Sequence, residues 1–293
     1  MIAADVVRVP VRGGDLTVAQ WGAGPDVVLA LHGITASHAQ FPPVVDRLPD
    51  GVRVIAPDLR GRGGSAGLPG PWGMSQHVQD CVAALDHLAV ERALLLAVSM
   101  GGFVGTLFAA RHPDRTRALV LVDGGTPFTL PEGTDVDMVL EATLGPSIQR
   151  LSQTFPSREA YHDFWRQHPA LGEDWSPYVE HYLDHDVEGP HDALRSKVSP
   201  EAIRADGRDL YSNTELKTCL ADIACPVLLV RAPRGLLNQP QPTIPDELVA
   251  DMRAAIPHLR DEMVEDVNHY TLAMGERGAA HVAQRVVEEL AAS

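Results

Sequence analysis

Short apolar segments that alternate with helical segments are the feature that most constrains the fold of this chain. The apolar runs are nearly continuous, as in strands that are buried on both faces; they lie at residues 27–31, 52–56, 93–98, 117–122 and 227–230. The segments with helical periodicity lie mostly between them, at about residues 75–89, 100–111, 246–256 and 277–291. This order predicts an α/β fold with a doubly wound, mostly parallel sheet. In such sheets the functional residues gather at the carboxyl ends of the strands.

Two regions depart from this alternation. Residues 5–20 alternate apolar and polar side chains around two glycines, which predicts an antiparallel hairpin at a sheet edge. The segment 127–213 is largely helical in pattern and rich in aromatic residues, Trp165 among them. We therefore expect a core formed by residues 1–126 and 214–293, with residues 127–213 inserted as a helical lid over the site. Trp165 is a candidate substrate contact within this lid.

The composition limits the partners that this chain can have. Its formal net charge of −15 argues against nucleic acid, whose phosphates require a basic face, and against docking on anionic membranes. Its first residues lack the pattern of a secretory signal, and no apolar run approaches the length of a membrane span. We expect a cytoplasmic protein with a small-molecule substrate, either a monomer or a homodimer.

The sequence does not predict a metal site. Cys81, Cys219 and Cys225 are odd in number and lack the paired spacing of zinc ligands, so they are expected to be buried thiols. His181 and His185 are spaced as two ligands on one helix face, but no third ligand is evident beside them. We expect neither a metal nor an organic cofactor.

The strand predicted at 93–98 ends at a serine between small residues. Ser99 is followed by a helical segment, and Ala97 and Gly101 stand two residues before and after it. This pattern predicts a nucleophile elbow, a strained turn that presents the serine hydroxyl and leaves no room for larger neighbours. The strict pattern has glycine at the place of Ala97, and a strand-to-helix turn without a catalytic role remains the alternative.

A serine nucleophile needs a base and an oxyanion hole. His269 follows the last predicted strand and precedes the final helix, where the base is expected. The backbone amides of Ile34, after the first central strand, and Met100, after the serine, are the candidate oxyanion donors. Each such donor contributes on the order of 3 kcal/mol to the stability of the transition state.

Together these segments resemble the α/β-hydrolase fold superfamily over nearly the whole chain. The matching residues are His32-Gly33, the stretch Asp58-Leu59-Arg60-Gly61-Arg62-Gly63-Gly64-Ser65, Ser99-Met100-Gly101-Gly102 and His269. The second stretch is similar to that of capped esterase- and lactonase-like members, with one extra glycine. The resemblance implies a serine hydrolase acting on an ester, thioester or lactone of a moderately apolar small molecule. His32 is a possible substrate contact.

The catalytic acid does not follow the pattern of the superfamily. Members usually carry it shortly after the strand that follows the lid, where this chain has Arg231 and Arg234. We expect Asp123, at the tip of the strand at 117–122, to take this role, because some members place the acid there; Asp246 is the second candidate. The two arginines could bind a substrate carboxylate or phosphate, or pair with the acids of the chain itself.

Two alternatives to ester hydrolysis remain open on the sequence. Capped relatives with a serine triad also hydrolyse carbon–carbon bonds of diketones. A non-hydrolytic member, such as a small-molecule receptor or a cyclase, would keep the pocket and lose the usual acid. A serine at the elbow, in place of aspartate, argues against epoxide hydrolase and dehalogenase chemistry.

Overall fold

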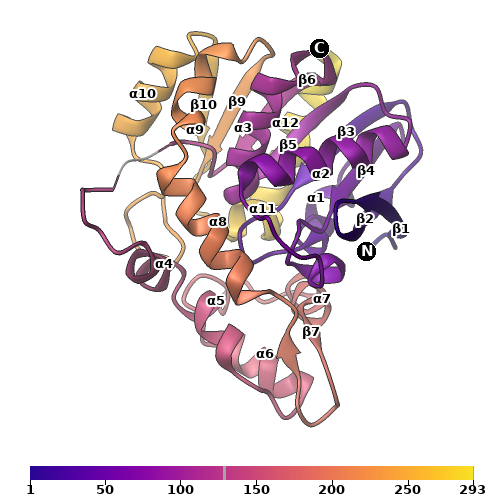
Figure 1. Cartoon of the computed structure of the whole chain (residues 1–293), viewed down its shortest axis with the longest axis vertical. Coiled ribbons are helices and arrows are strands. Elements are labelled where there is room, and N and C mark those ends of the chain that lie inside the picture. Colours follow the sequence, from indigo (N-terminus) through magenta and orange to yellow (C-terminus); the bar gives the residue numbers. More distant parts are fainter. Residues whose placement is uncertain (128–129, 293) are drawn as a thin grey trace.

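A mixed sheet of eight strands organises the computed structural model, which describes residues 1–127 and 130–292. The strand order is β1-β2-β4-β3-β5-β6-β9-β10. The strands are β1 (Asp5–Val11), β2 (Gly14–Trp21), β3 (Asp26–Leu31), β4 (Val52–Pro57), β5 (Ala93–Val98), β6 (Thr116–Val122), β9 (Val227–Arg231) and β10 (Leu259–Met263). Only the edge hairpin β1–β2 and its pairing with β4 are antiparallel. The predicted doubly wound sheet and hairpin are confirmed (Figure 1).

Helices cover both faces of this sheet. One face packs against α2 (Met74–His87), α3 (Met100–Arg111) and α10 (Asp246–Ala255). The other packs against α1 (Pro42–Val45), α11 (Thr271–Met274) and α12 (Glu276–Ala292). Consecutive residues of β3 enter opposite cores, Leu29 and Leu31 on the first face and Val28 on the second. This alternation explains why the central strands are apolar at nearly every position.

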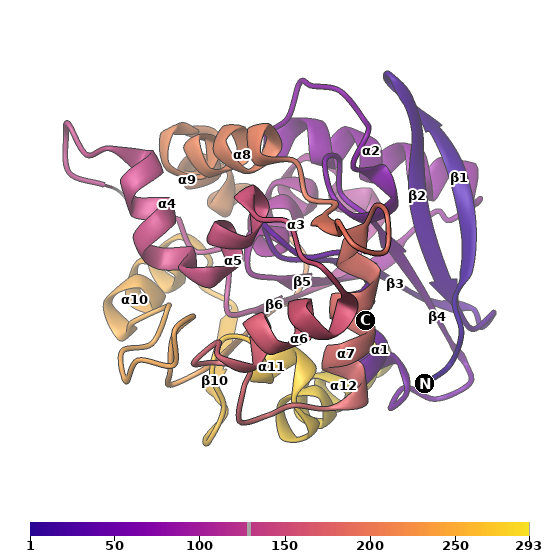
Figure 2. The same ribbon diagram turned by 90° about the horizontal axis from the view of Figure 1, so that it is seen from below.

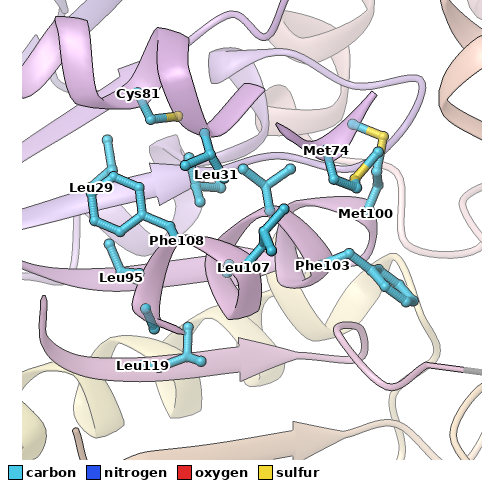
Figure 3. Close-up of a cluster of buried hydrophobic side chains, with 14 of the residues drawn as sticks. Leu29, Leu31, Met74, Cys81, Leu95, Met100, Phe103, Leu107, Phe108 and Leu119 are labelled. Atoms are coloured by element: carbon cyan, nitrogen blue, oxygen red, sulfur yellow. The ribbon is translucent and has the colours of Figure 1, made fainter. Parts of the chain in front are cut away.

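The core on the first face is built around α3. Leu107 and Phe108 of this helix point toward Leu29, Leu95 and Leu119 of the sheet (Figure 3). The buried thiol of Cys81 on α2 closes the same cluster, and Cys219 and Cys225 are buried as well. Burial raises the pKa of the Cys219 and Cys225 thiols to about 11, so both stay protonated near neutral pH. This packing fixes α3, which begins directly after Ser99.

The chain between β6 and β9 forms a largely helical insertion. Its elements are α4 (Val136–Leu144), α5 (Pro146–Gln149), α6 (Arg158–Arg166), α7 (Pro177–Asp186), the hairpin β7 (Val187–Glu188) and β8 (Arg195–Ser196), α8 (Pro200–Ser212) and α9 (Glu215–Thr218). Elements α4 to α7 lie below the sheet in Figure 1, and α8 leads from them up to α9; in the view from below, α5 and α6 lie in front of the central strands (Figure 2). In contrast, α9 packs on α3.

No helix within residues 1–127 and 130–292 has both the length and the apolar character needed to cross a membrane.

Candidate active site

The turn from β5 into α3 holds Ser99 in a strained conformation. Its backbone has φ 54° and ψ −120°, a region that non-glycine residues rarely occupy, and its amide donates to the carbonyl of Val122 (2.9 Å). A side chain at Gly101 would place its Cβ 2.1 Å from the carbonyl oxygen of Leu31. Only glycine therefore fits two residues after the serine.

The departure at Ala97 has a local compensation. Ala97 lies in the interior of β5, and a Cβ on Gly105 of α3 would come within 2.9 Å of the Ala97 Cβ. Helix α3 thus has no side chain at the point where the extra methyl group of Ala97 lies. The helix keeps its close approach to the strand although the methyl group stands before the serine.

His269 and Asp123 meet beside the elbow. Nδ1 of His269 lies 2.7 Å from Oδ2 of Asp123, and both residues are buried. The second carboxylate oxygen of Asp123 accepts a hydrogen bond from the amide of Ala232 (3.3 Å). A proton on Nδ1 that is donated to Asp123 leaves Nε2 as a proton acceptor. Ser99 and His269 line the same cavity, so this histidine has the surroundings of a general base.

The structure brings Asp123, and not Asp246, to His269. Asp246 begins α10, its side chain is 88% exposed, and it forms an ion pair with Arg231 (2.8 Å). Asp123 has φ 47° and stands at the tip of β6, where its amide donates to the carbonyl of Val230. The loop after β9, where the superfamily usually carries the acid, contributes the backbone amide of Ala232 to the carboxylate of Asp123.

The two residues expected to supply oxyanion donors lie beside Ser99. Ile34 and Met100 both line the cavity that Ser99 and His269 line. Within residues 1–127 and 130–292, neither amide donates a hydrogen bond to a protein acceptor. The carbonyl of Gly33 accepts from Nδ1 of His32 (2.8 Å) and from the amide of Ala36 (3.1 Å). Because a trans peptide points its N–H away from its C=O, these bonds turn the Ile34 amide to the other side.

Comparisons with known proteins identify the family of the chain. Residues 26–275 match the model of the alpha/beta hydrolase fold family.

The chain belongs to the alpha/beta hydrolase fold family.

The hydrolase is 30% identical over 272 residues to a 3-hydroxybutyrate-oligomer hydrolase of Cupriavidus necator, with 85% of each chain covered. It is 31% identical over 224 residues to a 2-(acetamidomethylene)succinate hydrolase of Mesorhizobium japonicum, with 76% of each covered. The crystal structure of an E-2-(acetamidomethylene)succinate hydrolase superposes with a TM-score of 0.81 at 23% identity, covering 99% of this chain and 100% of that one. The resemblance seen in the sequence is confirmed, and the protein is a hydrolase.

His32 does not line the cavities of the hydrolase beside Ser99, although the sequence suggested a substrate contact. Both ring nitrogens are engaged: Nδ1 donates to the carbonyl of Gly33, and Nε2 accepts from the amide of Leu59 (2.9 Å). Burial lowers the pKa of His32 to about 3, so the ring is neutral near pH 7. This histidine holds the loop that carries the Ile34 amide.

The two arginines after β9 are also engaged elsewhere. Arg231 is buried and pairs with Asp246 and Asp261 (both 2.8 Å). Arg234 donates to the carbonyls of Asp266 (3.2 Å) and Val267 (3.3 Å), which places it on the loop before His269. Neither lines the cavities beside Ser99. The suggestion that they bind substrate is therefore not supported, because the acids and carbonyls of the chain occupy their guanidinium groups.

Trp165 lies in the core of the insertion and does not line the cavities beside Ser99. Its ring packs edge-on against Tyr161 and Phe164 and stacks on His168. The guanidinium of Arg150 lies 5.2 Å from the ring centroid. The aromatic residues of the insertion thus stabilise it from within, which their number in the sequence could not distinguish from substrate contacts.

Two buried arginines, which the sequence analysis did not select, hold the loop after β3. Arg62 donates through Nε to the carbonyl of Ile34 (2.8 Å) and pairs with Asp206 of α8. Arg150 of the insertion donates to the carbonyl of Thr35 (2.9 Å) and pairs with Asp186 (2.9 Å). Arg62 lies in the family-like stretch Asp58–Ser65, which could have suggested this role. No local pattern marks Arg150.

Two cavities meet at Ser99 and His269. The apolar cavity has a volume of about 580 Å³, including space open to solvent, and its wall is mainly aliphatic and aromatic. Its apolar lining residues include Phe103, Leu140, Leu144, Leu210, Leu236 and Ile244. The second cavity, of about 330 Å³ including space open to solvent, has a mixed wall that includes Thr35, Gln40, Tyr182 and Tyr270. Among the described residues, no lysine or arginine lines either cavity.

Proposed function

We propose that this hydrolase is a serine esterase that cleaves an ester, thioester or lactone through an acyl-enzyme on Ser99. The single observation that supports this most is the cavity that Ser99 shares with His269, whose Nδ1 is bonded to a buried carboxylate. His269 takes the proton of Ser99 as the hydroxyl attacks the acyl carbon, and returns it to the leaving oxygen or sulfur. A water molecule then repeats the cycle and releases the acid.

The oxyanion of both tetrahedral intermediates is held by the amides of Ile34 and Met100. Neither amide donates to another acceptor in the described part of the chain, so both are available to the developing charge. The amide of Met100 also lies at the N-terminus of α3, where the helix dipole favours a negative charge. Asp123 orients His269 and stabilises its protonated ring.

The cavities favour a neutral substrate with an apolar part. A carboxylate bound in the apolar cavity would lose its hydration without a cation to replace it, since no lysine or arginine within residues 1–127 and 130–292 lines the wall. One relative is named for a succinate derivative, which carries carboxylates. We propose that this chain prefers an uncharged ester, with its apolar part in the apolar cavity and its polar part beside Gln40 and Tyr182.

The test begins with an activated-serine probe. Folded wild-type protein and the Ser99→Ala variant are exposed to a fluorophosphonate, and the mass of the intact protein is measured. We expect one adduct on the wild type and none on the variant. A wild type that is folded but stays unlabelled would overturn the esterase and favour a non-hydrolytic ligand-binding member.

The substrate class is tested with paired esters. We compare p-nitrophenyl butyrate with the p-nitrophenyl monoester of succinate, which has a similar chain length and one added charge. We expect kcat/KM to be at least tenfold higher for butyrate. Equal values would contradict the neutral preference, and cleavage of a diketone without ester turnover would favour carbon–carbon hydrolysis. A cytoplasmic location and a homodimer stay predictions from the sequence.

A further inference from the structure

A second cluster of chemically active side chains lies where the insertion meets the core. It contains His38 from the turn after β3, Asp58 directly after β4, and His185 from α7. One ligand atom of each lies within 4.8 Å of the other two. We propose that these three residues bind one zinc-like divalent transition-metal ion, which links α7 of the insertion to the core. This proposal does not depend on the esterase activity.

The donor set suits such an ion. Two imidazole nitrogens and one carboxylate oxygen are typical of zinc sites that keep a fourth position for water. Nδ1 of His38 lies 2.8 Å from Oδ1 of Asp58, and Nε2 of His185 lies 3.5 Å from Oδ2. Ligands at tetrahedral positions around Zn²⁺ are about 3.4 Å apart. The ligand atoms are at most 4.8 Å apart, so shifts of about 1 Å bring the three groups to this spacing around one ion.

Nε2 of His185 is weakly engaged and therefore available to bind an ion. Its Nε2 is enclosed, and within the described part of the chain its contact with Oδ2 of Asp58 (3.5 Å) is long for a hydrogen bond. Its ring contacts that of His38 edge-on, with centroids 4.3 Å apart. An enclosed polar atom without a partner is unfavourable. A metal ion between the two rings and the carboxylate would give this nitrogen a stronger partner.

The surroundings support this arrangement. The carboxylate of Asp58 also accepts from the amides of His38 (2.8 Å) and Gly64 (2.7 Å), which fix its orientation as outer hydrogen bonds do in metal sites. A cavity of about 860 Å³ reaches His38 and His185 and gives an ion a path of entry. His181, one helical turn before His185, lines the same cavity, so either this ring or water can fill the fourth position.

The sequence could not show this site. The pair His181 and His185 was visible by its spacing, but the expected third ligand was sought nearby. The structure supplies two ligands from the core, more than a hundred residues earlier in the chain. The expectation that no metal binds rested on this missing partner, and we replace it with the proposed site.

Metal binding is tested on the full chain without a histidine tag, after treatment with EDTA and dialysis. Zn²⁺ is titrated by calorimetry, and Co²⁺ binding is followed by its visible d–d absorption. We expect one ion per chain, a raised Tm, and no sulfur-to-cobalt charge-transfer band, because the ligands are nitrogen and oxygen. Absence of saturable binding by the folded wild type, or a thiolate band, would overturn the proposal.

Two variants assign the ligands. His185→Ala should weaken Zn²⁺ binding at least tenfold, while His191→Ala, which removes an exposed histidine of the same insertion, should leave it unchanged. His38→Gln removes the ligand on the core side and should weaken binding to a similar extent. Circular dichroism confirms that each variant is folded. Wild-type affinity in both His185→Ala and His38→Gln would refute the site.

Discussion

Replacing Asp123 with asparagine tests the proposed mechanism most directly. The backbone of Asp123 has φ 47°, a left-handed conformation that asparagine tolerates better than most residues. The substitution changes the volume of the side chain little and removes the charge. Any loss of activity can then be assigned to the carboxylate and not to a misfolded turn.

The magnitude follows from the two hydrogen bonds of this carboxylate. Asp123 accepts from Nδ1 of His269 (2.7 Å) and from the amide of Ala232 (3.3 Å), whereas an asparagine side chain has only one oxygen. If that oxygen faces Ala232, the NH₂ group faces Nδ1 and forces the proton onto Nε2, so that His269 cannot accept the proton of Ser99. If it faces His269, a buried amide loses its acceptor, which costs about 1–3 kcal/mol of stability.

Either orientation removes the charge that stabilises the protonated histidine in the transition state. We therefore expect Asp123→Asn to lower kcat by about 10⁴, or about 5.5 kcal/mol of activation free energy, with little change in KM. The assay is hydrolysis of p-nitrophenyl butyrate, with Ser99→Ala as the background. Asp246→Asn is the matched control, because its side chain is exposed and it was the second candidate for the acid.

An Asp123→Asn variant with kcat within tenfold of the wild type would refute the assignment of the acid. An equal loss in Asp246→Asn would refute it as well, since that carboxylate pairs with Arg231 and not with His269.

Two further predictions concern stability. The pKa of His32 is about 3 in the folded protein and about 6.5 in the unfolded chain, so protonation of this ring favours unfolding. The stability of the folded protein is therefore fully present above pH 6.5 and falls as the pH drops toward 3. Between pH 7.5 and 5 this amounts to about 2 kcal/mol, measured by urea denaturation, and His32→Gln should remove that part of the pH dependence while His191→Gln keeps it. A His32→Gln variant with the wild-type pH dependence would contradict this account. Asp206→Ala should lower the free energy of unfolding by about 3–5 kcal/mol, because it leaves the buried Arg62 without its partner on α8. The control is Asp137→Ala, which breaks an exposed pair with Arg208, a residue of α8 like Asp206, and should lower the free energy of unfolding by less than about 1 kcal/mol. Similar losses of stability in the two variants would argue against the buried pair.

The sequence predicted the core because the relevant signals are local. Buried parallel strands are apolar at every position and amphipathic helices repeat every three to four residues, so both can be seen in short windows. The expected strand at 93–98 and the helix at 100–111 agree with β5 and α3 to the residue. The elbow at Ser99 was visible for the same reason, since its strain is relieved by small residues close to it in the sequence.

The surroundings of the site could not be predicted, because they depend on contacts between distant residues. Arg231 and Trp165 are chemically suited to bind a substrate, but the folded chain uses the first in ion pairs and the second in the core of the insertion. Residue type alone does not distinguish these uses. The sequence favoured Asp123 over Asp246 as the acid, but only the structure gives the 2.7 Å distance between Asp123 and Nδ1 of His269.

The loop after β3 shows how these distant contacts bear on the proposed chemistry. Three consecutive carbonyls of this loop are each held by a buried side chain: Gly33 by His32, Ile34 by Arg62 and Thr35 by Arg150. Arg62 pairs with Asp206 of α8, and Arg150 pairs with Asp186 at the end of α7. The insertion therefore holds the two arginines that bind the carbonyls of Ile34 and Thr35. The carbonyl of Gly33 and the amide of Ile34 belong to one trans peptide, so the bonds to that carbonyl also fix the direction of the amide. The bonds of Arg62 and Arg150 fix the two peptides that follow. In the mechanism that we propose, these contacts would preorganise the oxyanion site, and the insertion would contribute to it through Arg150 as well as through the walls of the cavity.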